Sequence, residues 1–129
     1  MQAPEQKAHR SGLVLQRLTG PKVSLAQSHR LDLPRCCPIS GNPAPGSTLR
    51  LTYQPDLWCL EVYALESMVE SFVGGFDGAP GYDPDRNMEG MIATLAQMAA
   101  DATGVPVKAT ARLVLDAGRM TVRCHADPR

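Results

Sequence analysis

Strict alternation of apolar and polar residues in three stretches constrains the fold of this chain more than any other feature. In residues 47–53, Leu49, Leu51 and Tyr53 alternate with Thr48, Arg50 and Thr52. Residues 107–115 and 119–126 alternate in the same way on either side of Asp116-Ala117-Gly118. Successive side chains of a strand point to opposite faces, so this pattern predicts strands with one buried face, the last two joined as a hairpin.

The chain between these strands changes to helical spacing. Residues 63–73 and 88–103 carry apolar side chains three, four and seven positions apart, which predicts two consecutive helices. Residues 58–62 predict a short strand that follows a turn at residues 54–56 and runs back beside the strand at 47–53. Residues 74–87, rich in Gly, Pro and Asp, predict a long loop between the helices.

The resulting order is strand, strand, helix, helix, strand, strand, which predicts an α+β domain. We expect an antiparallel four-stranded sheet with both helices on one face. The other face then carries Arg50, Arg112, Arg119 and Arg123. Such a face is either a solvated polar surface or the electropositive lumen of a ring of subunits.

The N-terminal third of the chain shows weaker patterns. Residues 1–33 predict an N-terminal arm with peripheral strands, and residues 34–129 predict the main domain. A domain of this size buries only about two thirds of the surface its unfolded chain exposes, so we expect it to oligomerise.

Composition favours neither a nucleic acid nor a membrane as a partner. The chain has 13 basic and 13 acidic residues, which gives no reason to expect nucleic-acid binding from charge. No apolar run approaches the length of a membrane span, and residues 1–7 lack the apolar core of a secretion signal. We therefore expect a cytoplasmic protein without a membrane partner.

Two adjacent cysteines occur in the stretch CCPISGNP, residues 36–43. The four cysteines form no C-x-x-C pair, so neither a dense disulfide framework nor a zinc-finger pattern is present and free thiols are expected. A cysteine that does chemistry needs a lowered pKa, whereas a buried thiol acts as a small hydrophobic residue. The residues alone favour packing for both Cys36 and Cys37.

A family resemblance changes that balance for Cys37. The stretch PDLWCLEVYALESMVESF, residues 55–72, resembles the signature region of the NADPH-dependent 7-cyano-7-deazaguanine reductases, nitrile reductases of queuosine biosynthesis. The Cys-Pro-x-x-Gly-x-Pro run at residues 37–43 is similar to their nucleophile loop. The resemblance covers about residues 34–125 and implies the tunnelling fold, which has the element order given above and assembles into a barrel.

The resemblance also implies roles for individual residues. Cys37 stands where the family has the cysteine that adds to the nitrile carbon and forms a thioimide. Glu89 stands where a carboxylate at the start of the second helix accepts hydrogen bonds from a purine-like ligand. Glu61 matches the glutamate of the signature, at the junction between strand and first helix, and the resemblance implies that it completes the pocket from the neighbouring subunit. From the residues alone, Glu89 is a first-turn glutamate favoured by the helix dipole. Cys36, Cys59 and Cys124 are assigned to packing.

Several positions depart from the family. Tyr63 and Glu66 replace the two lysines that would bind the NADPH phosphates, and a glutamate repels phosphate. Val73 and Met88 replace an arginine and a histidine, and Ala44 stands where an acid would protonate the substrate. NADPH binding and reduction are therefore not expected.

Three hypotheses follow. The first is an enzyme that captures the nitrile of 7-cyano-7-deazaguanine on Cys37 and passes it to a nitrogen nucleophile, although Ala44 counts against it. The second is a non-catalytic tunnelling-fold protein that binds a purine-like ligand or serves in assembly. The third is a metal-dependent tunnelling-fold enzyme, which ranks last because His9, His29 and His125 include no His-x-His pair; no metal is expected.

Overall fold

The structure of the protein, a computed structural model, describes residues 5–21, 24–36, 41–72 and 88–129. In chain order these residues form β1 (Gln6–Ala8), β2 (Val14–Arg17), β3 (Gln27–Asp32), β4 (Thr48–Tyr53), β5 (Trp58–Leu60), α1 (Val62–Glu70), α2 (Met88–Thr103), β6 (Val107–Leu115) and β7 (Gly118–Ala126).

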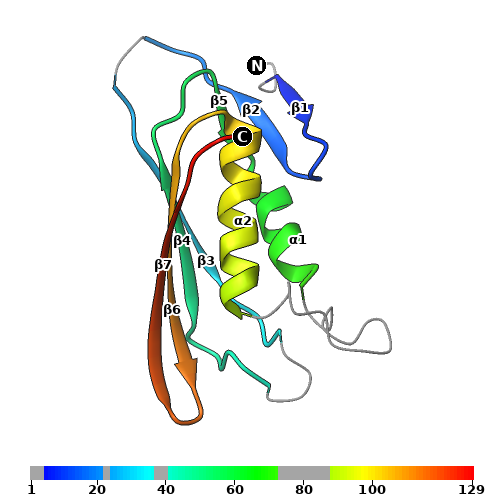
Figure 1. Cartoon of the computed structure of the whole chain (residues 1–129). Helices are drawn as coiled ribbons and strands as arrows, with labels where there is room; N and C mark the ends of the chain where they lie inside the picture. The colour runs from blue at the N-terminus through cyan, green and yellow to red at the C-terminus, as the bar shows by residue number, and fades with distance from the viewer. Residues whose placement is uncertain (1–4, 22–23, 37–40, 73–87) are drawn as a thin grey trace.

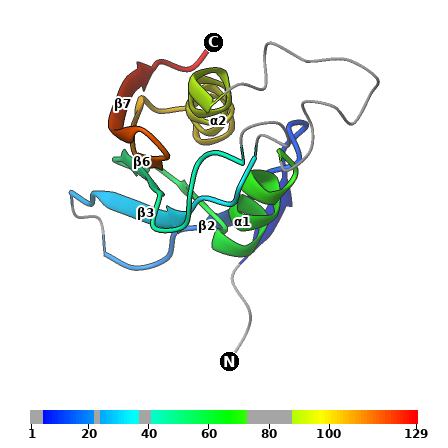
Figure 2. The ribbon, with the colours of Figure 1, turned by 90° about the horizontal axis from the view of Figure 1, so that it is seen from below.

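The main sheet has four antiparallel strands in the order β3-β4-β6-β7. Both helices lie on the same side of this sheet, with α2 along β6 and β7 and α1 beside it (Figure 1). The view from below shows the same arrangement, with the helices on one side of the strands and the other side of the sheet bare (Figure 2). The α+β class with a four-stranded antiparallel sheet is therefore confirmed.

The predicted hairpin between β4 and the strand that follows it is wrong. β5 pairs antiparallel with β2, with Leu60 opposite Leu15, and the neighbour of β4 at the edge of the main sheet is β3. β5 has only three residues, too few for its alternation to specify a partner. Its direct link to β4 is a single side-chain bond, in which the Leu60 N–H donates to the Tyr53 hydroxyl at 2.8 Å.

The N-terminal segment is built into the body of the molecule. β1 and β2 form a hairpin that joins β5, while β3 is an edge strand of the main sheet. Leu13, Leu15, Leu31 and Leu33 are all buried in the common core. In the turn before β2, Gly12 has φ of 96° and a Cβ there would lie 3.0 Å from the Met68 side chain, so the hairpin packs closely on α1.

The alternation places the core as the sequence predicts. On β4, Leu49, Leu51 and Tyr53 are buried, and on β6 the buried residues are Val107, Ala109, Ala111 and Leu113. They face α2, whose buried side chains include Met91, Ile92, Leu95, Ala96, Ala99 and Ala100. The helix at 88–103 begins and ends where periodicity predicts, whereas α1 ends at Glu70. No helix in the described part of the chain is long and apolar enough to cross a membrane.

The Tyr53 hydroxyl connects the two sheets through a small buried network. It accepts from the Leu60 N–H and donates to Gln27 Oε1, both at 2.8 Å, and His29 Nε2 lies 3.0 Å away with its ring stacked on the tyrosine. Burial raises the pKa of the Tyr53 hydroxyl and lowers the pKa of His29. Both groups therefore remain neutral near pH 7.

We predict that Tyr53→Phe lowers the free energy of unfolding by about 1–3 kcal/mol, because the buried Leu60 N–H loses its acceptor. Urea unfolding followed by circular dichroism measures the change. The matched control is Tyr63→Phe, at a tyrosine that is 75% exposed, and we expect it to change stability by less than about 0.5 kcal/mol. Equal effects of the two variants would contradict the role given to the Tyr53 hydroxyl.

Candidate functional site

The Cys-Pro loop is described at its two ends. The Cys36 N–H donates to the carbonyl oxygen of Asn42 at 3.1 Å, and Arg35 Nη1 donates to the carbonyl oxygen of Gly41 at 2.7 Å. These bonds hold residues 35–36 close to residues 41–42. Cys37, the predicted nucleophile, lies outside the described residues.

Cys36 fixes the start of this loop against α2. Its side chain is 1% exposed, and Sγ lies 3.3 Å from the carbonyl oxygen of Pro34 and 3.6 Å from Met91 Sδ. Met91 belongs to the first turns of α2, two residues after Glu89. The loop that carries Cys37 therefore begins next to the N-terminal end of the helix that carries the predicted ligand anchor.

The other described cysteines are held as thiols. Cys59 is buried, with Sγ 3.5 Å from the carbonyl oxygen of Gln16, and Cys124 is half-buried. Burial raises the pKa of both thiols, which disfavours the reactive thiolate. Their environment agrees with the packing role assigned to them.

Glu89 lies in the first turn of α2 with an exposed side chain. Within the described residues the Glu89 carboxylate makes no hydrogen bond or ion pair. A carboxylate at this position is favoured by the helix dipole, and its oxygens can accept hydrogen bonds.

Glu61 has a structural role that the sequence did not reveal. It is the N-cap of α1, and its two carboxylate oxygens accept from the N–H groups of Tyr63 and Ala64, each at 2.8 Å. Its own N–H donates to the carbonyl oxygen of Val14 at 2.8 Å. Glutamate is not among the residues usually found at an N-cap, so the sequence did not predict this contact.

The structure also shows where most of the positions that depart from the reductase pattern lie. Tyr63 and Glu66 are exposed on α1, and Val73 lies outside the described residues. The Ala44 N–H donates to the carbonyl oxygen of Val114 at 2.8 Å, and the Ser47 hydroxyl bridges the Ala44 carbonyl and the Val114 N–H, also at 2.8 Å each. The segment after Pro43 thus serves to attach the loop to β6.

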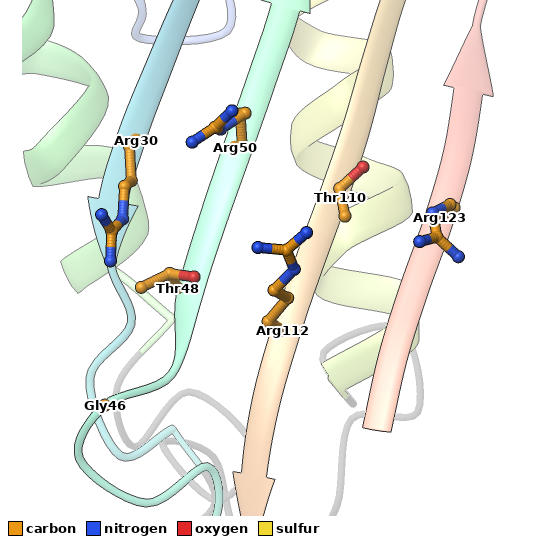
Figure 3. A pocket seen from close by; sticks show the side chains of 7 residues that line it. All are labelled: Arg30, Gly46, Thr48, Arg50, Thr110, Arg112 and Arg123. Atoms are coloured by element: carbon orange, nitrogen blue, oxygen red, sulfur yellow. The ribbon is translucent and has the colours of Figure 1, made fainter. Parts of the chain in front are cut away.

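A second candidate site lies on the bare face of the main sheet. A hollow of about 380 Å³ there is lined by Arg30, Gly46, Thr48, Arg50, Thr110, Arg112 and Arg123 (Figure 3). The prediction that Arg50, Arg112 and Arg123 lie on the face away from the helices is confirmed. Arg119 lines the adjoining surface. Arg30 was missed because the pattern of residues 22–33 did not show that β3 joins this sheet.

Metal ligands do not cluster in the described part of the chain. Within it, no group of three or more His, Cys, Asp and Glu side chains could hold a metal ion. The three histidines lie apart, with His9 bonded to Ser11, His29 stacked on Tyr53, and His125 within 3.4 Å of Asp127.

Comparison with known proteins identifies no family. No family model matches the chain, and no curated protein is significantly similar to it.

We predict that Glu61→Ala lowers the free energy of unfolding by about 0.5–2 kcal/mol, because two N–H groups at the start of α1 lose their acceptor. Chemical unfolding measures the loss. Glu70→Ala removes an exposed glutamate from the last turn of the same helix and should change stability by less than about 0.5 kcal/mol. A Glu61→Ala variant as stable as wild type would contradict the cap.

Proposed function

We propose that this protein is a member of the tunnelling-fold group related to the 7-cyano-7-deazaguanine reductases, and that it binds a purine-like ligand beside the Cys-Pro loop. The observation that carries the proposal is the contact of Cys36 with Met91, which brings the start of the loop to the end of α2 where Glu89 is exposed. A nucleophile and a carboxylate anchor must lie at one site to act on one ligand.

In this proposal Glu89 orients the ligand and Cys37 captures its nitrile. The thiolate of Cys37 adds to the nitrile carbon, and the nitrogen takes up a proton, which gives a thioimide without a leaving group. The exposed carboxylate of Glu89 accepts hydrogen bonds from ring N–H groups of the purine-like base. A nitrogen nucleophile such as ammonia would then displace the thiol.

NADPH-dependent reduction is not part of the proposal. Glu66 is exposed on α1 where the reductases carry a lysine for phosphate, and Ala44 supplies no side chain that can donate a proton. Ala44 is instead held to β6 through its backbone.

A non-catalytic ligand-binding role is the second candidate. The bonding of both Glu61 oxygens to the start of α1 favours it, because a residue expected to complete the pocket is used for helix capping. In that case binding is reversible and independent of Cys37.

We expect intact-protein mass spectrometry to show that 7-cyano-7-deazaguanine adds its full mass to the wild type and to Cys124→Ala, but not to Cys37→Ala. Cys124 is the matched control because its thiol is half-buried, and this burial raises its pKa and disfavours the reactive thiolate. Glu89→Gln should bind the ligand about tenfold more weakly by calorimetry, since one charge-assisted acceptor is lost, whereas Glu70→Gln should not.

The outcomes separate the two candidates. Reversible binding without an adduct would exclude capture and support the non-catalytic role. Oxidation of NADPH in the same reaction would contradict the loss of reduction, and unchanged affinity in Glu89→Gln would refute the position of the ligand.

We also propose that the protein assembles into a homo-oligomeric ring. Within the described residues β3 and β7 end the main sheet without a further partner, and edge strands of six and nine residues are long for a free edge. Pairing β7 of one copy with β3 of the next would extend the sheet around a barrel. Light scattering after gel filtration should give a mass of several chains. A monomer at micromolar concentration would refute the ring.

A further inference from the structure

Strand register places three arginines in one row across the bare face of the main sheet. Arg30 lies directly opposite Arg50, Arg50 is opposite Thr110, and Thr110 is opposite Arg123. The row therefore runs across all four strands, and its side chains project from the same side of the sheet (Figure 3). Arg112 and Thr48 are paired in the next row on the same face.

This face concentrates positive charge that the rest of the described chain does not neutralise. Its lysines and arginines are Arg30, Arg50, Lys108, Arg112, Arg119 and Arg123, and its single carboxylate is Asp32 at the β3 edge. None of these six cations makes an ion pair within the described residues. Like charges directly opposite each other in a sheet are destabilising, so the Arg30–Arg50 pair has a cost that an external anion would remove.

Acidic side chains lie close to one arginine of this face, at the β3 edge. Arg30 also lines a neighbouring hollow that contains Asp32, Glu66 and Glu70. Arg50, Arg112 and Arg123 do not line that hollow. They are the central cations of the bare sheet face, which we call the arginine face.

The shape of the face matches a small ligand better than a polymer. The hollow between the arginines has a volume of about 380 Å³, which is in the range of small-molecule sites. The whole chain has a formal charge of zero and a pI of about 6.8, unlike a typical nucleic-acid-binding domain. Thr48 and Thr110 add hydroxyl donors between the guanidinium groups. Gly46 lines one end of the hollow and places no side chain in it.

We propose that the arginine face binds a small molecule that carries two or more linked phosphate groups. Guanidinium groups bind phosphate oxygens through paired hydrogen bonds, and several of them at one site select a multivalent anion over a monovalent one. This site lies on the side of the sheet opposite the helices, so it is separate from the purine-like site proposed near Glu89 and does not depend on it.

The test uses inorganic tripolyphosphate and adenosine triphosphate as probes, with calorimetry at low salt. We expect wild type to bind both probes, and Arg50→Gln and Arg112→Gln to bind each about tenfold more weakly, since each loses a charge-assisted contact. Arg50→Lys should give an intermediate loss, because the charge remains but the paired hydrogen bonds do not. The matched control is Arg10→Gln, at an exposed arginine away from the sheet, which should bind as wild type does.

A second measurement shows that the variants are folded and tests the charge argument directly. Without an anion, Arg50→Gln should melt at the same temperature as wild type or higher, because repulsion with Arg30 is removed. With tripolyphosphate, the melting temperature of wild type should rise more than that of the variant.

Three results would overturn the proposal. The first is the absence of tripolyphosphate binding to wild type, and the second is an equal loss of affinity in Arg10→Gln. The third is a single-stranded oligonucleotide that binds more tightly than either probe in an Arg50-dependent manner, which would make the face a polymer surface.

Discussion

The register of β4 between β3 and β6 determines both faces of the main sheet. Leu49 and Leu51 are fully buried under the helices, and the residue between them, Arg50, must therefore point to the other side. A slip of one residue would bury Arg50 and expose both leucines, at a cost of several kcal/mol for the unpaired charge alone. Burial of the leucines on the helix side thus holds the arginine row in place on the other.

Small residues determine how closely the helix layer approaches the sheet. Ala96, Ala99 and Ala100 of α2 are fully buried, as is Ala111 of β6, while Ala109 is 1% exposed. Alanine faces on both partners let the helix lie close to the strands, and a larger side chain would push them apart. Because Glu89 lies in the first turn of α2 and Met91 of the same helix contacts Cys36, this packing also fixes the position of Glu89 relative to Cys36.

The sequence predicts correctly those elements in which the apolar pattern repeats many times along one continuous segment. The strands at 107–115 and 118–126 and the helix at 88–103 agree with prediction to within a residue, because each carries many repeats of its period. The partner of β5 was not predictable, since it lies in β2 more than 40 residues earlier and a three-residue strand has no register of its own. The cap formed by Glu61 was missed for a similar reason: its acceptor role depends on backbone geometry that the residue type does not indicate.

Zero net charge concealed the feature that distinguishes the two sides of the protein. Within the described residues, the bare sheet face carries six lysines and arginines against Asp32, whereas Glu61, Glu66, Glu70 and Glu89 belong to the helices and their starts. Composition averages over this segregation, and only strand register and helix position reveal it. If copies join edge to edge through β3 and β7, the arginines of the sheet face would lie on one side of the ring and the exposed helix glutamates on the other. The two proposed sites would then face different environments, with multivalent anions drawn to the sheet side and repelled from the helix side where Glu89 is exposed.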